Sequence, residues 1–393
     1  MRECVIVSAC RTPIGSFGGS LSSIPAPRLG ALVIAEAVRR AGVPPSEVQE
    51  VIMGNVLTAG EGQAPARQAA LFGGLPESVE CLTINKVCGS GLKAVMLASQ
   101  AIALGDADVI IAGGMESMSN VPYLLEKART GYRMGHGEVV DALIKDGLWE
   151  VYNNYHMGNA AELCAKECAI PREAQDEFAV ASYKRALEAQ AAGRFKEEIV
   201  PVEIPQRSGP DIIIDTDEEP GKAKFEKIPQ LKPAFQRDGT VTAANSSKIN
   251  DGAAALMLMA SDRAQALHVR PLARIVASVS SAKKPERFTT APVDAISKVL
   301  VKAGLTLNDI DLFEINEAFA VVPLAAMNTL GIASEKINVN GGAVALGHPI
   351  GASGARILVT LLYALRQRGL KRGLATLCIG GGEASALIVE CMW

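Results

Sequence analysis

The chain has few aromatic residues, few histidines and no long apolar run. Aromatic residues make up 4% of its 393 positions, and the four histidines form no two-histidine motif, so we predict no metal site. The longest apolar candidate, residues 318–327, contains a proline and ends at Asn328. A membrane-spanning helix needs about 20 apolar residues, so we expect no membrane span.

An excess of one charge is also absent. The 39 basic and 42 acidic residues give a net charge of −3, which excludes bulk attraction to nucleic acid or an anionic membrane. The N-terminus carries Glu3 beside Arg2 and then only a strand-length apolar run, which is not a secretory signal. Eight cysteines without such a signal favour free thiols in the cytoplasm. Cys164 and Cys168 share one helix face, where core packing is favoured over a metal site.

Strand-like runs alternate with alanine-rich helical stretches along the chain. The strand-like runs are residues 4–9, 50–53, 108–112 and 374–379, and residues 28–41 are a representative helical stretch. This alternation is typical of an α/β fold with buried sheets.

The chain also contains an internal repeat. In each copy a glycine-bearing turn precedes an apolar helix and a strand. The turns begin at Cys88 and Gly351, an offset of 351 − 88 = 263. The glycines after the strands are offset by 380 − 113 = 267, and Asn55 and Asn316 by 316 − 55 = 261. This spacing predicts a pseudo-duplicated fold of two similar α/β halves that face each other.

A segment of different composition separates the two copies. Residues 120–245 hold methionine, tyrosine, glycine and proline clusters and a charged stretch, which indicates a long insertion, partly helical and largely loop. Ligand binding and a solvated surface elaboration are about equally consistent with this pattern. We therefore predict three parts, namely residues 1–119 with 246–270, the loop domain 120–245, and residues 271–393.

Cys88 lies in a glycine-rich turn just before an apolar helix. Backbone N–H groups and the dipole at a helix N-terminus favour thiolate over thiol, and thiolate is the nucleophilic form. The flanking glycines leave N–H groups free to bind an oxyanion. A lone cysteine is more often a small buried hydrophobe, so this turn needs support from the rest of the chain.

Three later motifs supply that support. Asn316 closes a strand-like run, His348 lies in a glycine-rich turn before a helix, and Cys378 ends a strand that runs into three glycines. Each motif is weak alone, because a glycine-rich turn with a histidine is more often structural. The three glycines are not a dinucleotide loop, since they lie too close to the C-terminus for a Rossmann unit.

Together the four motifs resemble the thiolase family, specifically its acetoacetyl-CoA-forming branch, from residues 5–15 through 378–382. The resemblance implies a five-layer αβαβα fold and acetyl-CoA C-acetyltransferase activity, the reversible Claisen condensation of two acetyl-CoA to acetoacetyl-CoA and CoA.

The resemblance also assigns catalytic roles. Cys88 would carry the acyl group, Cys378 would act as acid and base, and His348 would activate Cys88. With a water held by Asn316, His348 would stabilise the enolate oxygen. The N–H groups of Cys88 and Gly380 would bind the acyl-enzyme oxyanion.

Further expectations concern the substrate and assembly. By resemblance, the groove for the coenzyme A thioester substrate is lined by Leu148, His156, Met157, Phe235, Ala243, Ser247, Ile249 and Phe319. His156 alone would indicate an ordinary packed histidine. No separate cofactor is implied. Residues 119–146 resemble the loop through which such enzymes form a dimer of dimers, so we expect a cytoplasmic homotetramer that serves lipid metabolism.

The chain departs from the family pattern at several positions. Lys248 could contact a phosphate or point to water, and the effect of Glu383 on Cys378 is open. Pro220 stands where a potassium-activated branch has a tyrosine ligand, so potassium is left out. Residues 288–292 resemble eukaryotic members, some of which accept 2-methyl-branched substrates. The alternatives are therefore a 3-ketoacyl-CoA thiolase for longer or branched chains and a non-catalytic acyl-CoA-binding subunit.

Overall fold

The computed structural model describes residues 2–392, and its main element is one mixed β-sheet. The strands follow the spatial order β14 (Leu312–Ile315), β15 (Arg372–Ile379), β16 (Glu383–Cys391), β13 (Ala273–Ala282), β1 (Cys4–Arg11), β12 (Asn250–Ala260), β5 (Val109–Ser117), β3 (Glu50–Gly54) and β4 (Glu80–Ile84). A short strand, β2 (Gly15–Ser16), pairs with β12.

This strand order is symmetric about the contact between β1 and β13. On one side β1, β12, β5 and β3 follow one another, and on the other side β13, β16, β15 and β14 do so. The outer pairs β3–β5 and β14–β15 are both parallel, whereas the inner pairs are antiparallel. A parallel bridge from Phe313 to Ile337 stands where the first half has β4. The predicted duplication is therefore present.

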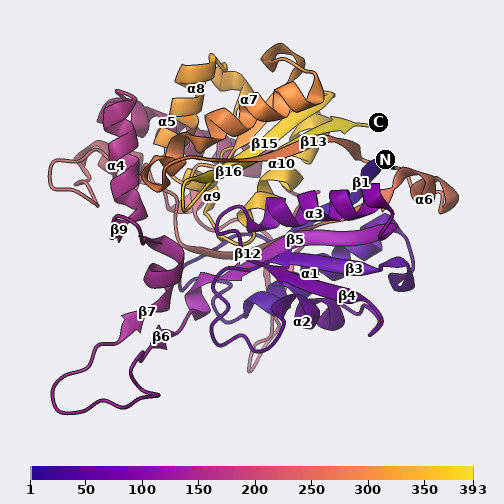
Figure 1. Cartoon of the computed structure of the whole chain (residues 1–393), viewed down its shortest axis with the longest axis horizontal. Coiled ribbons are helices and arrows are strands. Elements are labelled where there is room, and N and C mark those ends of the chain that lie inside the picture. Colours follow the sequence, from indigo (N-terminus) through magenta and orange to yellow (C-terminus); the bar gives the residue numbers. More distant parts are fainter. Residues whose placement is uncertain (1, 393) are drawn as a thin grey trace.

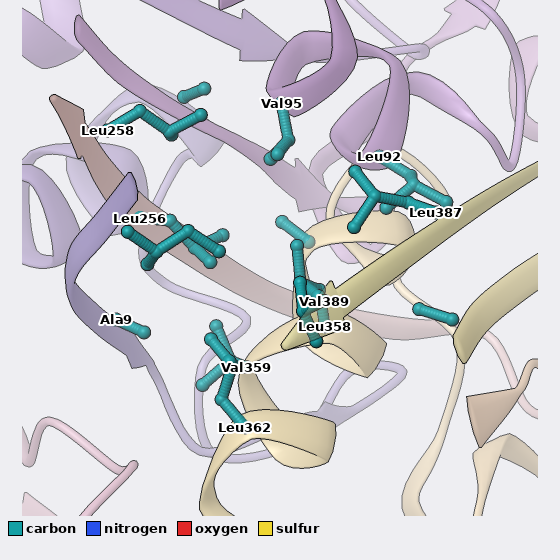
Figure 2. Close-up of a cluster of buried hydrophobic side chains, with 14 of the residues drawn as sticks. Ala9, Leu92, Val95, Leu256, Leu258, Leu358, Val359, Leu362, Leu387 and Val389 are labelled. Carbon is teal, nitrogen blue, oxygen red and sulfur yellow. The ribbon is translucent and has the colours of Figure 1, made fainter. Parts of the chain in front are cut away.

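Helices complete five layers around the two half-sheets (Figure 1). The central layer is α3 (Ser90–Leu104) and α10 (Ser353–Arg368). Outside the first half-sheet lie α1 (Ala26–Ala41) and α2 (Pro65–Phe72), and outside the second lie α7 (Ala291–Ala303) and α8 (Val321–Leu330). Figure 2 shows side chains of α3, α10 and both half-sheets meeting in the central core. The predicted αβαβα fold is confirmed.

The structure corrects one expectation, which concerned the segment that is the longest apolar candidate for a membrane span. Residues Val87–Leu104 are long and apolar enough to cross a membrane by length and composition, although the sequence analysis selected residues 318–327 instead. In the structure this stretch is packed between the half-sheets, and Leu92 and Val95 are fully buried. A helix that is apolar all round is expected in such a central layer.

The pairing of the strands corrects one of the offsets between the two copies of the internal repeat. Gly54 of β3 faces Gly114 of β5, and Ile315 of β14 faces Thr376 of β15. The structural offset at these strands is therefore 376 − 114 = 262, and the offset of 267 was wrong. The error arose because Gly113 lies within β5, whereas the later glycines form the turn between β15 and β16.

The insertion contributes two α-helices and three small strand pairs. The strands and α-helices between residues 120 and 245 are β6 (Tyr123–Leu124), β7 (Val140–Asp141), β8 (Trp149–Glu150), β9 (Tyr155–His156), α4 (Met157–Glu167), α5 (Arg172–Ala191), β10 (Val202–Ile204) and β11 (Ile212–Ile214). A π-helix, Leu143–Leu148, and two 3₁₀ helices, Pro220–Lys222 and Phe225–Gln230, also lie in this segment. The short helices α6 (Ser261–Ala266) and α9 (Ala343–Leu346) lie outside the insertion. The loop between β6 and β7 projects from the body (Figure 1). The three-part division of the chain stays a prediction.

Candidate active site

A cavity of about 290 Å³ lies where the two halves and the insertion meet. Of the predicted site residues, it is lined by Cys88, Leu148, His156, Met157, Phe235, Ser247, Ile249, Phe319, His348 and Gly380. Cys378 and Asn316 are buried and do not line it. Ala243 is exposed and is not among the residues that line this cavity, so its place in the groove stays a prediction. The structure thus brings ten predicted residues together around one space.

The turn before α3 presents Cys88 to this cavity. Val87 has φ 45°, a left-handed conformation that is strained for a β-branched residue. The Ser90 hydroxyl braces the turn by donating to the Val87 carbonyl at 2.7 Å and accepting the Lys86 N–H at 2.8 Å. Gly89 is required here because a Cβ would lie 2.3 Å from Ile379. The turn therefore fits closely against the end of β15.

The ionisation of Cys88 differs from the sequence expectation. Burial raises the pKa of the thiol to about 11, although the N–H groups of Gly380 and of Cys88 itself favour the thiolate. Desolvation therefore outweighs the helix N-terminus, and the resting form is the neutral thiol. Such a thiol needs a base at the moment of attack.

His348 is arranged to be that base. Its Nδ1 lies 2.5 Å from the Ser353 hydroxyl oxygen, and that hydroxyl donates its only proton to the Pro349 carbonyl at 2.8 Å. Nδ1 must then carry the ring hydrogen, which leaves Nε2 as a lone-pair acceptor without a protein partner. Burial, together with the Arg356 charge, lowers the pKa of His348 to about 3. The imidazole is therefore neutral at physiological pH.

Asn316 and Cys378 are buried next to residues that line the cavity, Ala318 and Gly380. Asn316 follows β14 and is 1% exposed, yet neither its amide oxygen nor its amide nitrogen has a hydrogen-bond partner. Unpaired buried amides are rare and indicate a place for a water or ligand. Burial raises the pKa of Cys378 well above its usual value, and the neighbouring Cys88 acts in the same direction. The two thiols are thus close enough to influence each other.

Aromatic rings form one wall of the cavity. His156 stacks on Phe235 with ring centroids 4.8 Å apart, and its Nδ1 accepts the Gly158 N–H at 3.1 Å. Phe319 contacts Phe235 edge-on at 6.0 Å and Phe288 at 6.5 Å. The sequence analysis did not assign Phe288 to the groove. This apolar wall suits the thin arm of an acyl carrier.

The contacts of Lys248 match neither possibility raised by the sequence, which were a phosphate contact and a side chain that points to water. Its Nζ turns back to donate to the carbonyls of Ala243 at 2.7 Å, Ser246 at 2.8 Å and Val344 at 3.4 Å. Burial lowers the pKa of Lys248 to about 8, against the opposing charges of Glu219 and Glu317. The ammonium therefore ties the 243–249 segment to the run before His348.

Two further residues named in the sequence analysis, Glu383 and Cys164, have defined contacts. Glu383 pairs with Lys86, which lies two residues before Cys88. Cys164 lies in the core beneath α7 and α8, and its sulfur is 4.0 Å from that of Cys168, as the packing interpretation predicts. Among residues 2–392 there is no cluster of three or more His, Cys, Asp or Glu side chains that could hold a metal ion.

Sequence reasoning missed three supporting residues. Ser353 sets the tautomer of His348. Glu317 accepts bonds from Ser182, Asn338 and the Val344 N–H, which braces the run before His348. Glu116 holds the turn after His348. The available signal for the two glutamates was a carboxylate within an apolar strand for Glu116 and just after one for Glu317, because buried charges need partners.

Comparison with known proteins agrees with this geometry. Residues 4–262 match the family model of the thiolase N-terminal domain, and residues 269–391 match that of the thiolase C-terminal domain. The acetyl-CoA acetyltransferase of Cupriavidus necator is 56% identical over 391 residues, covering 99% of this chain and all of that protein.

Two solved structures share the whole fold. The acetyl-CoA acetyltransferase of Bacillus anthracis superposes with a TM-score of 0.97 at 44% identity, covering 100% of this chain and 99% of that one. The Acat5 thiolase of Ascaris suum, solved in complex with coenzyme A, superposes with a TM-score of 0.95 at 43% identity and covers 100% of both chains.

Proposed function

Because the chain belongs to the thiolase family and is an acyltransferase, an acetyl-CoA C-acetyltransferase, we propose that it condenses two acetyl-CoA through an acetyl group on Cys88. The observation that carries this mechanism is the free Nε2 of His348 at a cavity lined by a neutral thiol. Acetyl-CoA and CoA are its substrate and product.

The first half-reaction loads Cys88. Its sulfur attacks the thioester carbonyl of acetyl-CoA, and its proton passes to Nε2 of His348. The bond from carbonyl carbon to CoA sulfur breaks, and the departing sulfur takes the proton of Cys378. This leaves an acetyl thioester, an imidazolium and a Cys378 thiolate, which is the base that the next step needs.

The second half-reaction forms the carbon–carbon bond. Cys378 removes an α-proton from a second acetyl-CoA, and the carbanion attacks the acetyl carbon on Cys88. Acetoacetyl-CoA leaves, and the Cys88 sulfur recovers its proton from His348. The imidazolium and a water held by the unpaired Asn316 amide stabilise the enolate oxygen, while the N–H groups of Cys88 and Gly380 stabilise the tetrahedral intermediates.

The acetyl-enzyme is the species to detect. Incubation with acetyl-CoA should release CoA and add about 42 Da to the peptide that contains Cys88, because an acetyl group replaces the thiol hydrogen. The Cys88→Ser variant is the control and should stay unlabelled in this short incubation. Unmodified wild-type peptide with no CoA release would instead indicate a non-catalytic acyl-CoA-binding subunit.

Chain-length preference is tested by thiolysis. Acetoacetyl-CoA should be cleaved faster than a six- to eight-carbon 3-ketoacyl-CoA at equal concentrations. The reverse order would identify a thiolase for longer chains. We propose no further cofactor, since two thiols, one imidazole and backbone N–H groups supply every proton and charge in these steps.

We also propose a cytoplasmic homotetramer acting in lipid metabolism. Support for the assembly comes from the projecting loop between β6 and β7, in which Leu125, Met134 and Val139 are exposed. Exposed apolar side chains on an extended loop favour contact with another copy. Analytical ultracentrifugation should give four times the chain mass for the wild type and a smaller species when residues 125–139 are replaced by a short glycine-serine linker. A wild-type mass near that of one chain would contradict the proposal.

A further inference from the structure

Because the fold is duplicated, a catalytic position in one half has a structurally equivalent position in the other half. With the corrected register, Glu116 of β5 occupies the place that Cys378 holds in β15, because β3–β5 and β14–β15 are aligned by the same pairing. The turns before α10 and α3 likewise pair Gly351 with Cys88. The half without the acid/base thiol therefore carries a buried carboxylate at the same place.

Glu116 is held by four donors in its fully buried position. Its Oε1 accepts the Asn55 side-chain amide at 2.9 Å and the Leu57 N–H at 3.1 Å. Its Oε2 accepts the Val56 N–H at 3.1 Å and the Gly351 N–H at 2.8 Å. Two separate parts of the chain, residues 55–57 and Gly351, therefore converge on one carboxylate.

The bond to Gly351 reaches the catalytic histidine. Gly351 lies three residues after His348, in the same turn as the Pro349 carbonyl that orients Ser353. The fit is close, because a Cβ at position 351 would lie 2.6 Å from the Glu116 Oε2. Glu116 and Asn250, whose amide oxygen accepts the His348 N–H at 2.9 Å, thus hold this turn of the second half on strands of the first half.

We propose that Glu116 is a positioning residue for His348, whose carboxylate holds the 348–351 turn on β5. The kinetic part of this inference rests on the proposed function, whereas the thiol chemistry can be measured without substrate.

The charges around Glu116 predict a pH dependence of Cys88 reactivity that can be measured. Burial raises the pKa of Glu116 to about 7 despite its four donors, and the pKa of the neighbouring Glu61 is raised to about 8. The Glu116 charge in turn raises the pKa of Cys88, which also faces Cys378. Ionisation of Glu116 near neutral pH should therefore make Cys88 harder to ionise.

Alkylation of Cys88 by iodoacetamide, followed by mass spectrometry from pH 5.5 to 9.5, tests this coupling. The logarithm of the wild-type rate should rise with pH and flatten in part, to a slope of about 0.7, between about pH 6 and 8, where Glu116 ionises. The Glu116→Gln variant should rise without flattening and react about threefold faster than wild type at pH 8.5, because the like charge is gone. Superimposable profiles would overturn the coupling.

Steady-state kinetics test the positioning role. In Glu116→Gln, kcat should fall about tenfold or more with KM changed less than about threefold, because the base is displaced while the groove stays intact. Glu116→Asp should recover part of the kcat and the flattened profile. Wild-type kcat in Glu116→Gln would overturn the positioning role.

A matched control separates these effects from lost stability. Asp217 is another buried carboxylate, bonded to Arg11 at 2.6 Å and to the Ile14 N–H at 2.9 Å, away from the cavity lining. Asp217→Asn should lower the melting temperature without changing the alkylation profile. If Glu116→Gln does not fold, Asn55→Ala removes one donor from Glu116 and should move the flattened region to higher pH. An unmoved region would contradict the inference.

Discussion

The Nδ1 atom of His348 and the hydroxyl oxygen of Ser353 are 2.5 Å apart, and this contact determines which ring nitrogen is free. The hydroxyl proton is already donated to the Pro349 carbonyl, so the hydrogen between the two residues belongs to the imidazole. A serine at the start of α10 thereby prepares the opposite nitrogen to accept the proton of Cys88.

Replacing Ser353 with alanine should therefore slow acylation. Without the acceptor, the imidazole can place its hydrogen on Nε2, which then cannot act as a base. We expect kcat to fall about tenfold or more, since a positioned general base contributes at least about a hundredfold, with little change in KM. Rapid-quench measurement of CoA release in the first turnover reports this step.

Thr360→Ala is the matched control for Ser353→Ala. Thr360 is a fully buried hydroxyl on the same helix, and it donates to Glu198 at 3.1 Å rather than to the catalytic histidine. Its removal should lower stability by about 1 kcal/mol and leave the first turnover unchanged. Equal rate losses in the two variants would show that the Ser353 effect is not specific to the tautomer.

The rate of acylation should depend little on pH around neutrality. The pKa of His348 is lowered to about 3 and that of Cys88 is raised to about 11, so both reacting groups are neutral throughout the range between them. We expect the first-turnover rate at saturating acetyl-CoA to vary less than about threefold from pH 6 to 8. A tenfold fall as pH drops across this range would indicate a histidine that titrates normally.

The sequence was sufficient for features that depend on local pattern. Glycines around Cys88 and His348 mark turns that side chains would block, and apolar periodicity marks α3 and the buried strands. These features predicted the α/β class, the duplication and the turns at Cys88 and His348, because each depends on a few neighbouring residues. The five-layer fold and the residues of the groove were instead implied by the resemblance to the thiolase family.

Features created by docking of the two halves were not predictable in this way. The local turn favours a thiolate at Cys88, but burial raises the pKa of this thiol, and the cavity around it is lined in part by residues of the insertion and of the second half. The contact between Glu116 and Gly351 joins residues that are 235 positions apart, so no local sequence pattern predicts it. The contacts of Lys248 were not predictable because its three carbonyl acceptors are determined by the path of the backbone, which side-chain types do not encode.

Phe288 should limit the length of the acyl chain. Its ring is 2% exposed and lines the cavity beside Phe319, so it occupies space that a longer acyl group would need. Phe288→Leu should raise kcat/KM for a six-carbon 3-ketoacyl-CoA, relative to acetoacetyl-CoA, by about tenfold, because one or two methylenes are worth about 1–3 kcal/mol in such a pocket. Thiolysis assays with both substrates measure the ratio.

The control for Phe288→Leu is a phenylalanine outside the cavity. Phe313 of β14 is equally buried but does not line the cavity. Phe313→Leu should destabilise the protein to a similar extent and keep the substrate ratio of the wild type. A ratio that rises in both variants would mean that general loosening, and not the ring of Phe288, changes the preference.

Lys248→Met should weaken substrate binding more than it slows turnover. Methionine keeps the length of the side chain but leaves the Ala243 and Ser246 carbonyls without their donor, and residues 246–249 line the cavity. Bonds to a charged donor are worth about 1.5–3 kcal/mol, so we expect KM for acetyl-CoA to rise about tenfold and kcat to change less than about threefold.

The ammonium form of Lys248 gives the same interaction a pH dependence. Because its pKa is lowered to about 8, the three bonds are present below that pH and weaken as pH rises through it. Wild-type KM should therefore increase between pH 7.5 and 9, whereas the KM of Lys248→Met should be flat. Lys302→Met, which removes a similar lysine bond to the Ser278 carbonyl at 2.9 Å on the surface, should keep the wild-type profile. A wild-type KM that stays constant over this range would show that the Lys248 ammonium does not order the groove.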